Sequence, residues 1–330
     1  MAEQQLRFLS ARDVVQALPM KEAVEAMREA FRQLSAGQAV APPRTQIAAR
    51  DPDGDALFMS SYIPADQRMG LKIITLFGGN AARGLPRIQA IVVVLDATNG
   101  SPIAVMDGTS LTAIRTGAAS GVATDVLARA DAQQAAIFGC GPQARTQLAA
   151  VCAVRPIRAA RVFDVAAERV ATFAREMAGQ LGISVEVAAS PAAALDGADV
   201  VCTATTSAEP VFADADLAAG VHINAIGSYK PHVREIPGET VRRARVVVDH
   251  LAFALDEAGD LLIPIAEGLI TKDHIAAELG EIIAGLKPGR QSPDEVTFFK
   301  SVGIAVQDLA AAGRVLANAE RLGLGITLSL

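Results

Sequence analysis

The sequence predicts an α/β fold with a doubly wound parallel sheet and a second, antiparallel or mixed sheet. Three observations support this. A glycine-rich turn joins a short apolar run to a helical segment; short apolar runs then alternate with helical segments; and before the turn, apolar runs follow one another without intervening helices. A chain of 330 residues is long enough for two domains with their own cores.

The glycine-rich turn has the pattern G-x-G-x-x-A of dinucleotide-binding (Rossmann) folds. Gly139 permits the tight turn, Gly141 lets a pyrophosphate approach the backbone, and Ala144 lets the helix pack close to the strand. Pro142 and Gln143 lie in the turn, and a helix is expected from Arg145, with free N–H groups and a helix dipole at its start that attract phosphate. Such a pattern alone is a weak signal, because ordinary surface turns also produce it.

A second feature strengthens the dinucleotide interpretation. An apolar strand over 159–164 ends in Asp164, about twenty residues beyond the turn, where a carboxylate can bind the ribose hydroxyls. This carboxylate favours NAD(H), since it repels a 2′-phosphate. Arg161 and Arg169 are close enough in sequence to keep NADP(H) possible. The alternative is an ordinary βαβ turn with an exposed aspartate.

The chain after the turn predicts about six parallel strands. Ligands bind at the carboxyl ends of such strands, so Thr205, Gly227 and Ser228 are candidate cofactor contacts, although such residues also form ordinary turns. The further strands are expected at 184–188, 199–202, 221–226 and 245–249, with helices at 166–180 and 192–195. The segment 297–309 is expected to open a final helix.

The first part of the chain predicts two amphipathic helices over 11–36, divided at Pro19, and an extended or looped segment over 40–55. Strands are expected at 57–59, 70–76, 88–95 and 102–106, and a small-residue helix at 111–127. Lys72 interrupts an apolar strand; it either has a task or points to water from an edge strand. Arg115, at an alanine-rich helix start, is placed to bind a carboxylate or phosphate. Arg44 has no local signal that distinguishes it from a surface arginine.

Composition excludes several classes of function. The net charge of −6 and the absence of basic blocks argue against nucleic acid as a partner. The sequence lacks an apolar run of about eighteen residues, so no membrane span is expected. Its three cysteines and four histidines show no metal-ligand spacing, so no metal is expected. Residues 1–5 lack the basic start of a signal peptide, and a cytoplasmic protein with reduced thiols is expected.

Several segments together resemble the ornithine cyclodeaminase/μ-crystallin family. They are Gly70-Leu71-Lys72, Gly84-Leu85-Pro86, 95–96, 111–116, the glycine turn, Ile223-Asn224-Ala225-Ile226-Gly227 and Lys300-Ser301-Val302-Gly303. The resemblance implies a homodimer whose subunit has a substrate-binding and dimerisation domain (1–118 plus 300–330) and an inserted Rossmann domain (119–299), with the active site in the cleft between them.

The same resemblance implies residue roles. Arg44, Lys72 and Arg115 would surround the substrate carboxylate, and Val302 and Tyr229 would contact the substrate. Cofactor contacts would come from Arg115, Thr116, the glycine turn, Asp164, Thr205, Ala225, Gly227, Ser228 and Ser301.

One departure from the family pattern bears on the reaction. Cyclodeaminases and related alanine dehydrogenases carry an aspartate shortly after Asn-Ala-Ile/Val-Gly, and Tyr229 takes its place in this sequence. A tyrosine with an ordinary pKa near 10 is a poor base at neutral pH. The predicted function is therefore NAD(P)H-dependent reduction of Δ1-pyrroline-2-carboxylate or Δ1-piperideine-2-carboxylate to L-proline or L-pipecolate. Lys72 would either complete the carboxylate clamp or protonate the imine nitrogen. An ornithine cyclodeaminase, an alanine-type dehydrogenase and a non-catalytic binding protein are the alternatives.

Overall fold

The computed structural model describes residues 5–50 and 53–330, which form two compact units. The first unit is Met1–Arg115 with Ile304–Leu330, and the second is Thr116–Gly303. The expectation about a signal peptide rests on residues 1–5, of which only Gln5 is described. Residues 51–52 of the segment expected to be extended or looped also lie outside the described part.

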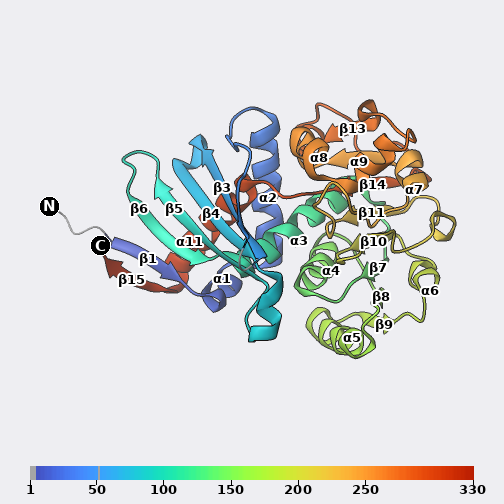
Figure 1. Ribbon diagram of the computed structural model, residues 1–330, viewed down its shortest axis with the longest axis horizontal. Helices are drawn as coiled ribbons and strands as arrows, with labels where there is room; N and C mark the ends of the chain where they lie inside the picture. Colours follow the sequence, from blue (N-terminus) through green and yellow to red (C-terminus); the bar gives the residue numbers. More distant parts are fainter. Residues whose placement is uncertain (1–4, 51–52) are drawn as a thin grey trace. The chain divides into compact units, whose positions relative to one another are not determined.

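The first unit contains a seven-stranded sheet in the order β15-β1-β6-β5-β4-β3-β2 (Figure 1). Neighbouring strands are antiparallel except β1 and β6, so the sheet is mixed, as the absence of intervening helices predicted. Of the two conformations expected for 40–55, the extended one is observed over 45–50, which pairs antiparallel with 53–58. The strands are β1 (Gln5–Leu9), β2 (Thr45–Arg50), β3 (Asp53–Ile63), β4 (Arg68–Leu76), β5 (Ile88–Asp96), β6 (Pro102–Asp107) and β15 (Ile326–Ser329).

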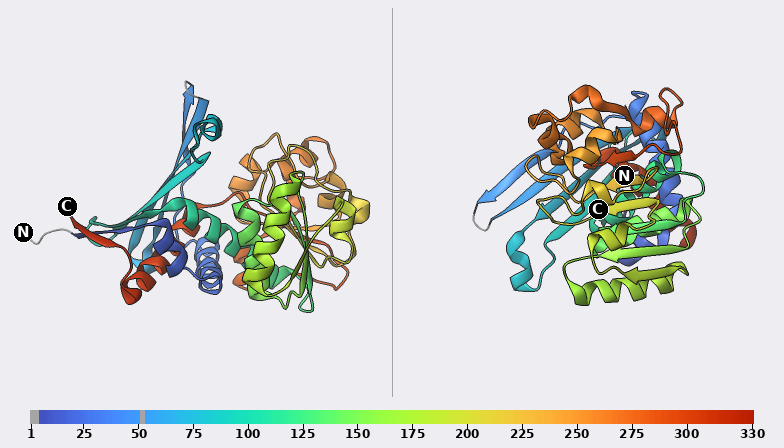
Figure 2. Two further views of the ribbon diagram at one scale, coloured as in Figure 1. Left: turned by 90° about the horizontal axis from the view of Figure 1, so that it is seen from below. Right: turned by 90° about the vertical axis from the view of Figure 1, so that its right-hand side faces the viewer.

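This unit contains the helices α1 (Ala11–Ala17), α2 (Met20–Ser35) and α11 (Ala305–Leu322), and also the start of α3 (Gly108–Leu127) as far as Arg115. Ser10 caps α1 through a reciprocal bond with Asp13, and Pro19 precedes α2, as the sequence predicts. Helix α11 packs against β3, β4 and β5, and Figure 2 shows α2 and α11 along one side of the sheet. A Cβ on Gly70 would lie 2.8 Å from Leu309 of α11, so the alternate residues Gly70 and Lys72 face this helix.

The second unit contains an eight-stranded, wholly parallel sheet in the order β13-β12-β14-β11-β10-β7-β8-β9. Its core lies on both faces: Ala136 and Phe138 of β7 join one apolar cluster, whereas Ala135 and Ile137 join the other. Burial on both faces explains why these strands read as continuous apolar runs. The strands are β7 (Gln134–Phe138), β8 (Ala159–Phe163), β9 (Ser184–Val187), β10 (Val200–Thr203), β11 (His222–Ala225), β12 (Arg245–Val248), β13 (Ile275–Glu278) and β14 (Thr297–Lys300).

Two expectations for this unit were wrong. The sheet has eight strands rather than about six, because β13 and β14 were not recognised. Residues 297–300 form the buried strand β14 and not the start of the last helix, which begins at Ala305.

The remaining helices are α3 (Gly108–Leu127), α4 (Pro142–Val154), α5 (Ala167–Leu181), α6 (Pro191–Leu195), α7 (Gly238–Arg243), α8 (Leu251–Glu257), α9 (Gly259–Ala266) and α10 (Leu279–Ile283). Short 3-10 turns lie at Pro64–Asp66, Gly78–Arg83, Asp214–Asp216 and Lys272–His274.

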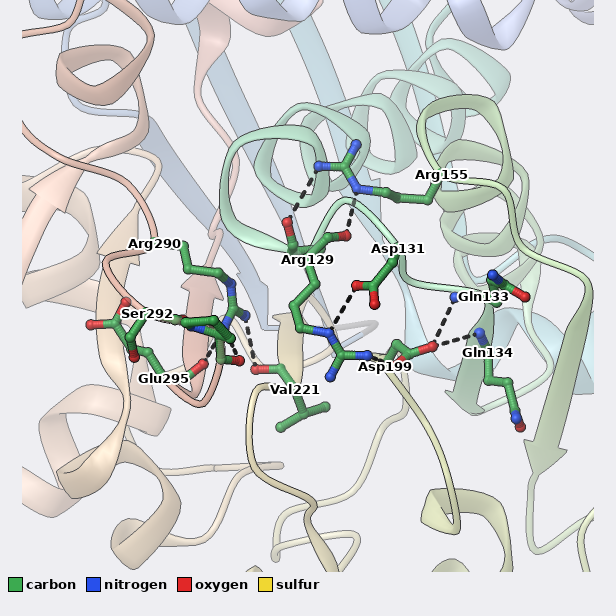
Figure 3. Close-up of polar contacts among 12 residues, drawn as sticks. Arg129, Asp131, Gln133, Gln134, Arg155, Asp199, Val221, Arg290, Ser292 and Glu295 are labelled. Carbon is green, nitrogen blue, oxygen red and sulfur yellow. Dashed lines mark hydrogen bonds and ion pairs between the residues drawn. The ribbon is translucent and has the colours of Figure 1, made fainter.

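A polar network holds the amino ends of the parallel strands (Figure 3). Asp199, just before β10, accepts hydrogen bonds from the backbone N–H groups of Gln133 and Gln134 at 2.8 and 3.0 Å. Its other oxygen pairs with Arg129 Nη2 at 2.6 Å. These contacts fix the amino ends of the strands, opposite the ends where the glycine turn lies.

In the described part of the chain, no helix has the length and apolar character needed to cross a membrane.

Candidate functional site

The glycine turn lies between β7 and α4, as predicted, and its two glycines meet different constraints. Gly139 has φ +100°, and an added Cβ would lie 2.6 Å from the Ala204 carbonyl oxygen, so this position requires glycine. Gly141 precedes α4, and a Cβ there would meet no described atom within 4 Å. Among the described residues no side chain caps α4, whose first turn contains Pro142, Gln143 and Ala144. Open space before an uncapped helix N-terminus fits the pyrophosphate of a dinucleotide.

Asp164 follows β8 and is fixed beside this turn. Its carboxylate accepts hydrogen bonds from the backbone N–H groups of Cys140 and Ala166, at 3.0 and 2.8 Å. Burial opposes ionisation, but these contacts and the nearby Arg169 charge hold the pKa of Asp164 below its usual value. Arg161 instead bonds Asp196, so Arg169 is the nearer of the two arginines named in the sequence.

The predicted contacts at the ends of β10 and β11 converge on a residue that the sequence did not single out. The Glu235 carboxylate accepts hydrogen bonds from Thr205, Gly227 and Ser228. Ala225 is the last residue of β11 and is buried. Tyr229 follows this group and is partly exposed.

Ser301 and Val302 are held by a second buried carboxylate. Asp249 Oδ2 accepts bonds from Ser301 Oγ at 2.7 Å and from the backbone N–H groups of Val302 and Gly303 at 2.9 and 2.8 Å.

Thr116 begins the part of α3 that belongs to the second unit, and its carbonyl accepts a bond from Gln147 of α4. Gly117 allows this approach, because a Cβ there would lie 2.5 Å from the Thr146 carbonyl oxygen.

The first unit contains a buried cluster of charged residues. Lys72 is 2% exposed, on an interior strand of the sheet, so the alternative of an edge lysine in water was wrong. Lys72 Nζ lies 2.8 Å from Asp308 Oδ2, and Arg115 Nε lies 2.9 Å from Asp308 Oδ1. Arg115 Nη1 also donates to Gln307 Oε1 at 2.5 Å. Asp308 of α11 therefore joins two of the three predicted substrate residues.

Burial lowers the pKa of Lys72 to about 7. The Asp308 charge opposes this shift, whereas the charges of Arg115 and the half-buried Arg44 add to it. The three predicted substrate residues are thus close enough to interact, and Asp308 pairs with two of them, Lys72 and Arg115. Neighbouring cationic side chains are suited to binding an anionic ligand, and an amine with a pKa near neutrality can gain and release a proton.

The sequence analysis missed Asp308, Gln307, Glu235 and Asp249. The pair Gln307-Asp308 on an apolar, alanine-rich helix was a usable signal, because buried charges need partners. Glu235 gave no such signal, since it stands among polar residues and prolines that predict an exposed loop.

Known proteins are similar to this chain over nearly its whole length. A Δ1-pyrroline-2-carboxylate reductase of Bacillus cereus is 38% identical over 318 residues, which cover 96% of this chain and 98% of the relative. The structure of Thermococcus litoralis Δ1-pyrroline-2-carboxylate reductase, in complex with NADH and L-proline, is similar with a TM-score of 0.93 and 42% identity, covering 97% of this chain and 99% of that one. An archaeal alanine dehydrogenase dimer with bound NAD has a TM-score of 0.92 and 34% identity, covering 99% of this chain and all of that one (100%). The model of the ornithine cyclodeaminase/mu-crystallin family matches residues 4–322, and the chain belongs to this family.

Proposed function

We propose that this chain is an NAD(P)H-dependent reductase of a cyclic imino acid, with Δ1-pyrroline-2-carboxylate or Δ1-piperideine-2-carboxylate as substrate. The observation that carries the proposal is the buried Lys72 beside two arginines. The arginines suit the carboxylate of the substrate, and the Lys72 pKa of about 7 suits proton transfer to the imine nitrogen. The relatives named as pyrroline-2-carboxylate reductases, at 38% and 42% identity, support the same substrate class.

The residues divide the work between binding and proton transfer. Arg44 and Arg115 hold the substrate carboxylate by charge-assisted hydrogen bonds, with Arg115 oriented by Asp308 and Gln307. When bound, the reduced nicotinamide supplies the hydride that reaches the C=N carbon. Lys72 Nζ donates a proton to the imine nitrogen, so the C=N bond becomes a C–N bond with a new N–H. Asp308 stabilises the protonated amine before transfer.

The second unit is the proposed cofactor domain, and the first is the proposed substrate and dimerisation domain. NAD(H) is favoured, because Asp164 is ionised beside the glycine turn and opposes a 2′-phosphate; NADP(H) remains a second candidate through Arg169. The relative bound to NADH and the relative bound to NAD support the same cofactor.

A substrate panel tests the reaction. We expect NADH oxidation with Δ1-pyrroline-2-carboxylate, little with pyruvate plus ammonia, and no ammonia release from ornithine in the presence of NAD. The alanine dehydrogenase relative makes amination of pyruvate the second candidate. Turnover of pyruvate with ammonia that exceeds imine reduction would replace the proposal with that activity. Ammonia release from ornithine would show that Tyr229, or another group, does the work of the missing aspartate.

A further inference from the structure

Glu235 is a fully buried carboxylate, 0% exposed, and each of its oxygens accepts several hydrogen bonds. Oε1 accepts from the backbone N–H and the hydroxyl of Thr205, at 2.7 and 2.6 Å. Oε2 accepts from Thr203 Oγ1 at 3.0 Å and from the backbone N–H groups of Gly227 and Ser228 at 2.7 and 3.2 Å. One side chain therefore ties the end of β10 to the end of β11.

The chemistry of these contacts demands a carboxylate. Both oxygens face backbone N–H groups, which can only donate, so a glutamine would have to turn its own NH2 toward a donor in either orientation. Burial raises the pKa of Glu235, and the Asp260 charge adds to this; the Thr205 donors and the Lys300 ammonium oppose the shift and favour the ionised form. Lys300 is itself buried 2.8 Å from Asp260, and it donates to the Ser228 carbonyl.

The anchored strand ends contact the glycine turn. The residue after β10, Ala204, has its carbonyl oxygen 2.6 Å from where a Gly139 Cβ would lie. A Cβ on Gly227 would lie 2.4 Å from the Thr205 carbonyl oxygen and 2.6 Å from both Glu235 oxygens. The three strand ends are thus packed closely enough that a shift of Thr205 or Gly227 reaches the turn directly.

We infer that Glu235 is the positioning residue of the dinucleotide site: it fixes the ends of β10 and β11 against the glycine turn and thereby sets cofactor affinity. This inference rests on the proposed function only in assuming that a dinucleotide binds at this edge of the sheet. Glu235 acts through the backbone of Thr205, Gly227 and Ser228 and need not touch the cofactor itself.

The test compares Glu235→Gln with a control at the amino ends of the strands of the same sheet. Asp199→Asn makes the same chemical change, since Asp199 also accepts backbone N–H groups at one oxygen and a cationic donor at the other (Figure 3). We expect both variants to lower Tm. We expect Glu235→Gln to raise the Kd of NADH, measured by fluorescence titration, about ten-fold or more, and Asp199→Asn to leave it within about two-fold.

A gentler variant keeps the inference testable if Glu235→Gln does not fold. Thr203→Val removes one of the donors at nearly constant shape, and we expect a rise of about three-fold in the Kd of NADH. In either variant the KM for the imine, at saturating NADH, should change less than the KM for NADH. An unchanged Kd of NADH in whichever of these variants folds, beside a lowered Tm, would reduce Glu235 to a structural role and overturn the inference. Wild-type protein that binds NADH but does not reduce imines would instead overturn the proposed substrate and leave this inference standing.

Discussion

Asp308 is the residue on which the candidate substrate site depends. It is buried, and it pairs with Lys72 through one oxygen and with Arg115 through the other. Removing one member of a buried ion pair is costly, about 3–5 kcal/mol, because the remaining charge loses its partner. If Asp308 is replaced, part of this cost is avoided, because Lys72 can release its proton and become neutral.

A pH profile tests the proposed proton donor. In the proposed mechanism the protonated form of Lys72 is the active one, so kcat/KM for imine reduction should fall as pH rises through about 7. Asp308→Asn removes the negative charge that raises this pKa, and we expect the fall to move to lower pH. Asp199→Asn, in the other unit, should leave the profile unchanged. If Asp308→Asn keeps the wild-type profile, Lys72 is not the titrating donor.

We expect the choice between NADH and NADPH to depend on a single residue, Asp164. Asp164→Ser removes the carboxylate beside the glycine turn while Arg169 stays, so relative use of NADPH should improve by about ten-fold or more. The matched control is Asp196→Ser, which removes an aspartate that bonds Arg161 instead. Steady-state kcat/KM values for NADH and NADPH provide the measurement. A wild type that strongly prefers NADPH would show that Asp164 does not select the cofactor.

At the scale of the elements, we expect the two glycines of the turn between β7 and α4 to have different roles. Gly139 is needed for folding and Gly141 for binding. We expect Gly139→Ala to lower Tm, because it combines φ +100° with a contact of 2.6 Å to Ala204. Gly141→Ala should fold normally, since its methyl group enters open space, but should weaken NADH binding about ten-fold or more by occupying the place proposed for pyrophosphate. Thermal denaturation and NADH titration of both variants decide this. Normal NADH affinity in Gly141→Ala would place the pyrophosphate elsewhere.

The elements also show how far sequence reasoning extends. The strand, turn and helix around Gly139 were predictable, because periodicity and turn chemistry are local signals. The strand β14 was missed, since its four residues include Lys300 and run directly toward a helix. The contact of Arg115 with Asp308 joins residues 193 positions apart, and only the folded chain brings them together. The roles assigned to the site residues stay predictions.

At the scale of the whole molecule, the sheet of the first unit presents an apolar face away from α11. Lys72 and Gly70 face α11, so Leu71 and Ile73 between and beside them face the other way. The register continues this face across the sheet, pairing Leu71 with Val93, Val93 with Val105 and Val105 with Phe8. Phe8, Ile91, Ile326 and Leu328 are exposed large apolar residues. A contiguous apolar surface of this kind is typical of an interface.

We expect a second copy of this chain to cover that face, because the face places several large apolar side chains in water. Ile91 is 44% exposed on β5, so Ile91→Asp should not disturb folding of the subunit, but it would bury a carboxylate without a partner in the dimer. The control is Val15→Asp, at a residue 57% exposed on α1. Light scattering at micromolar concentration should give a dimer mass for the wild type and for Val15→Asp, and a monomer or a concentration-dependent mixture for Ile91→Asp. A monomeric wild type would leave the apolar face without this explanation, and a dimeric Ile91→Asp would place the interface on another surface.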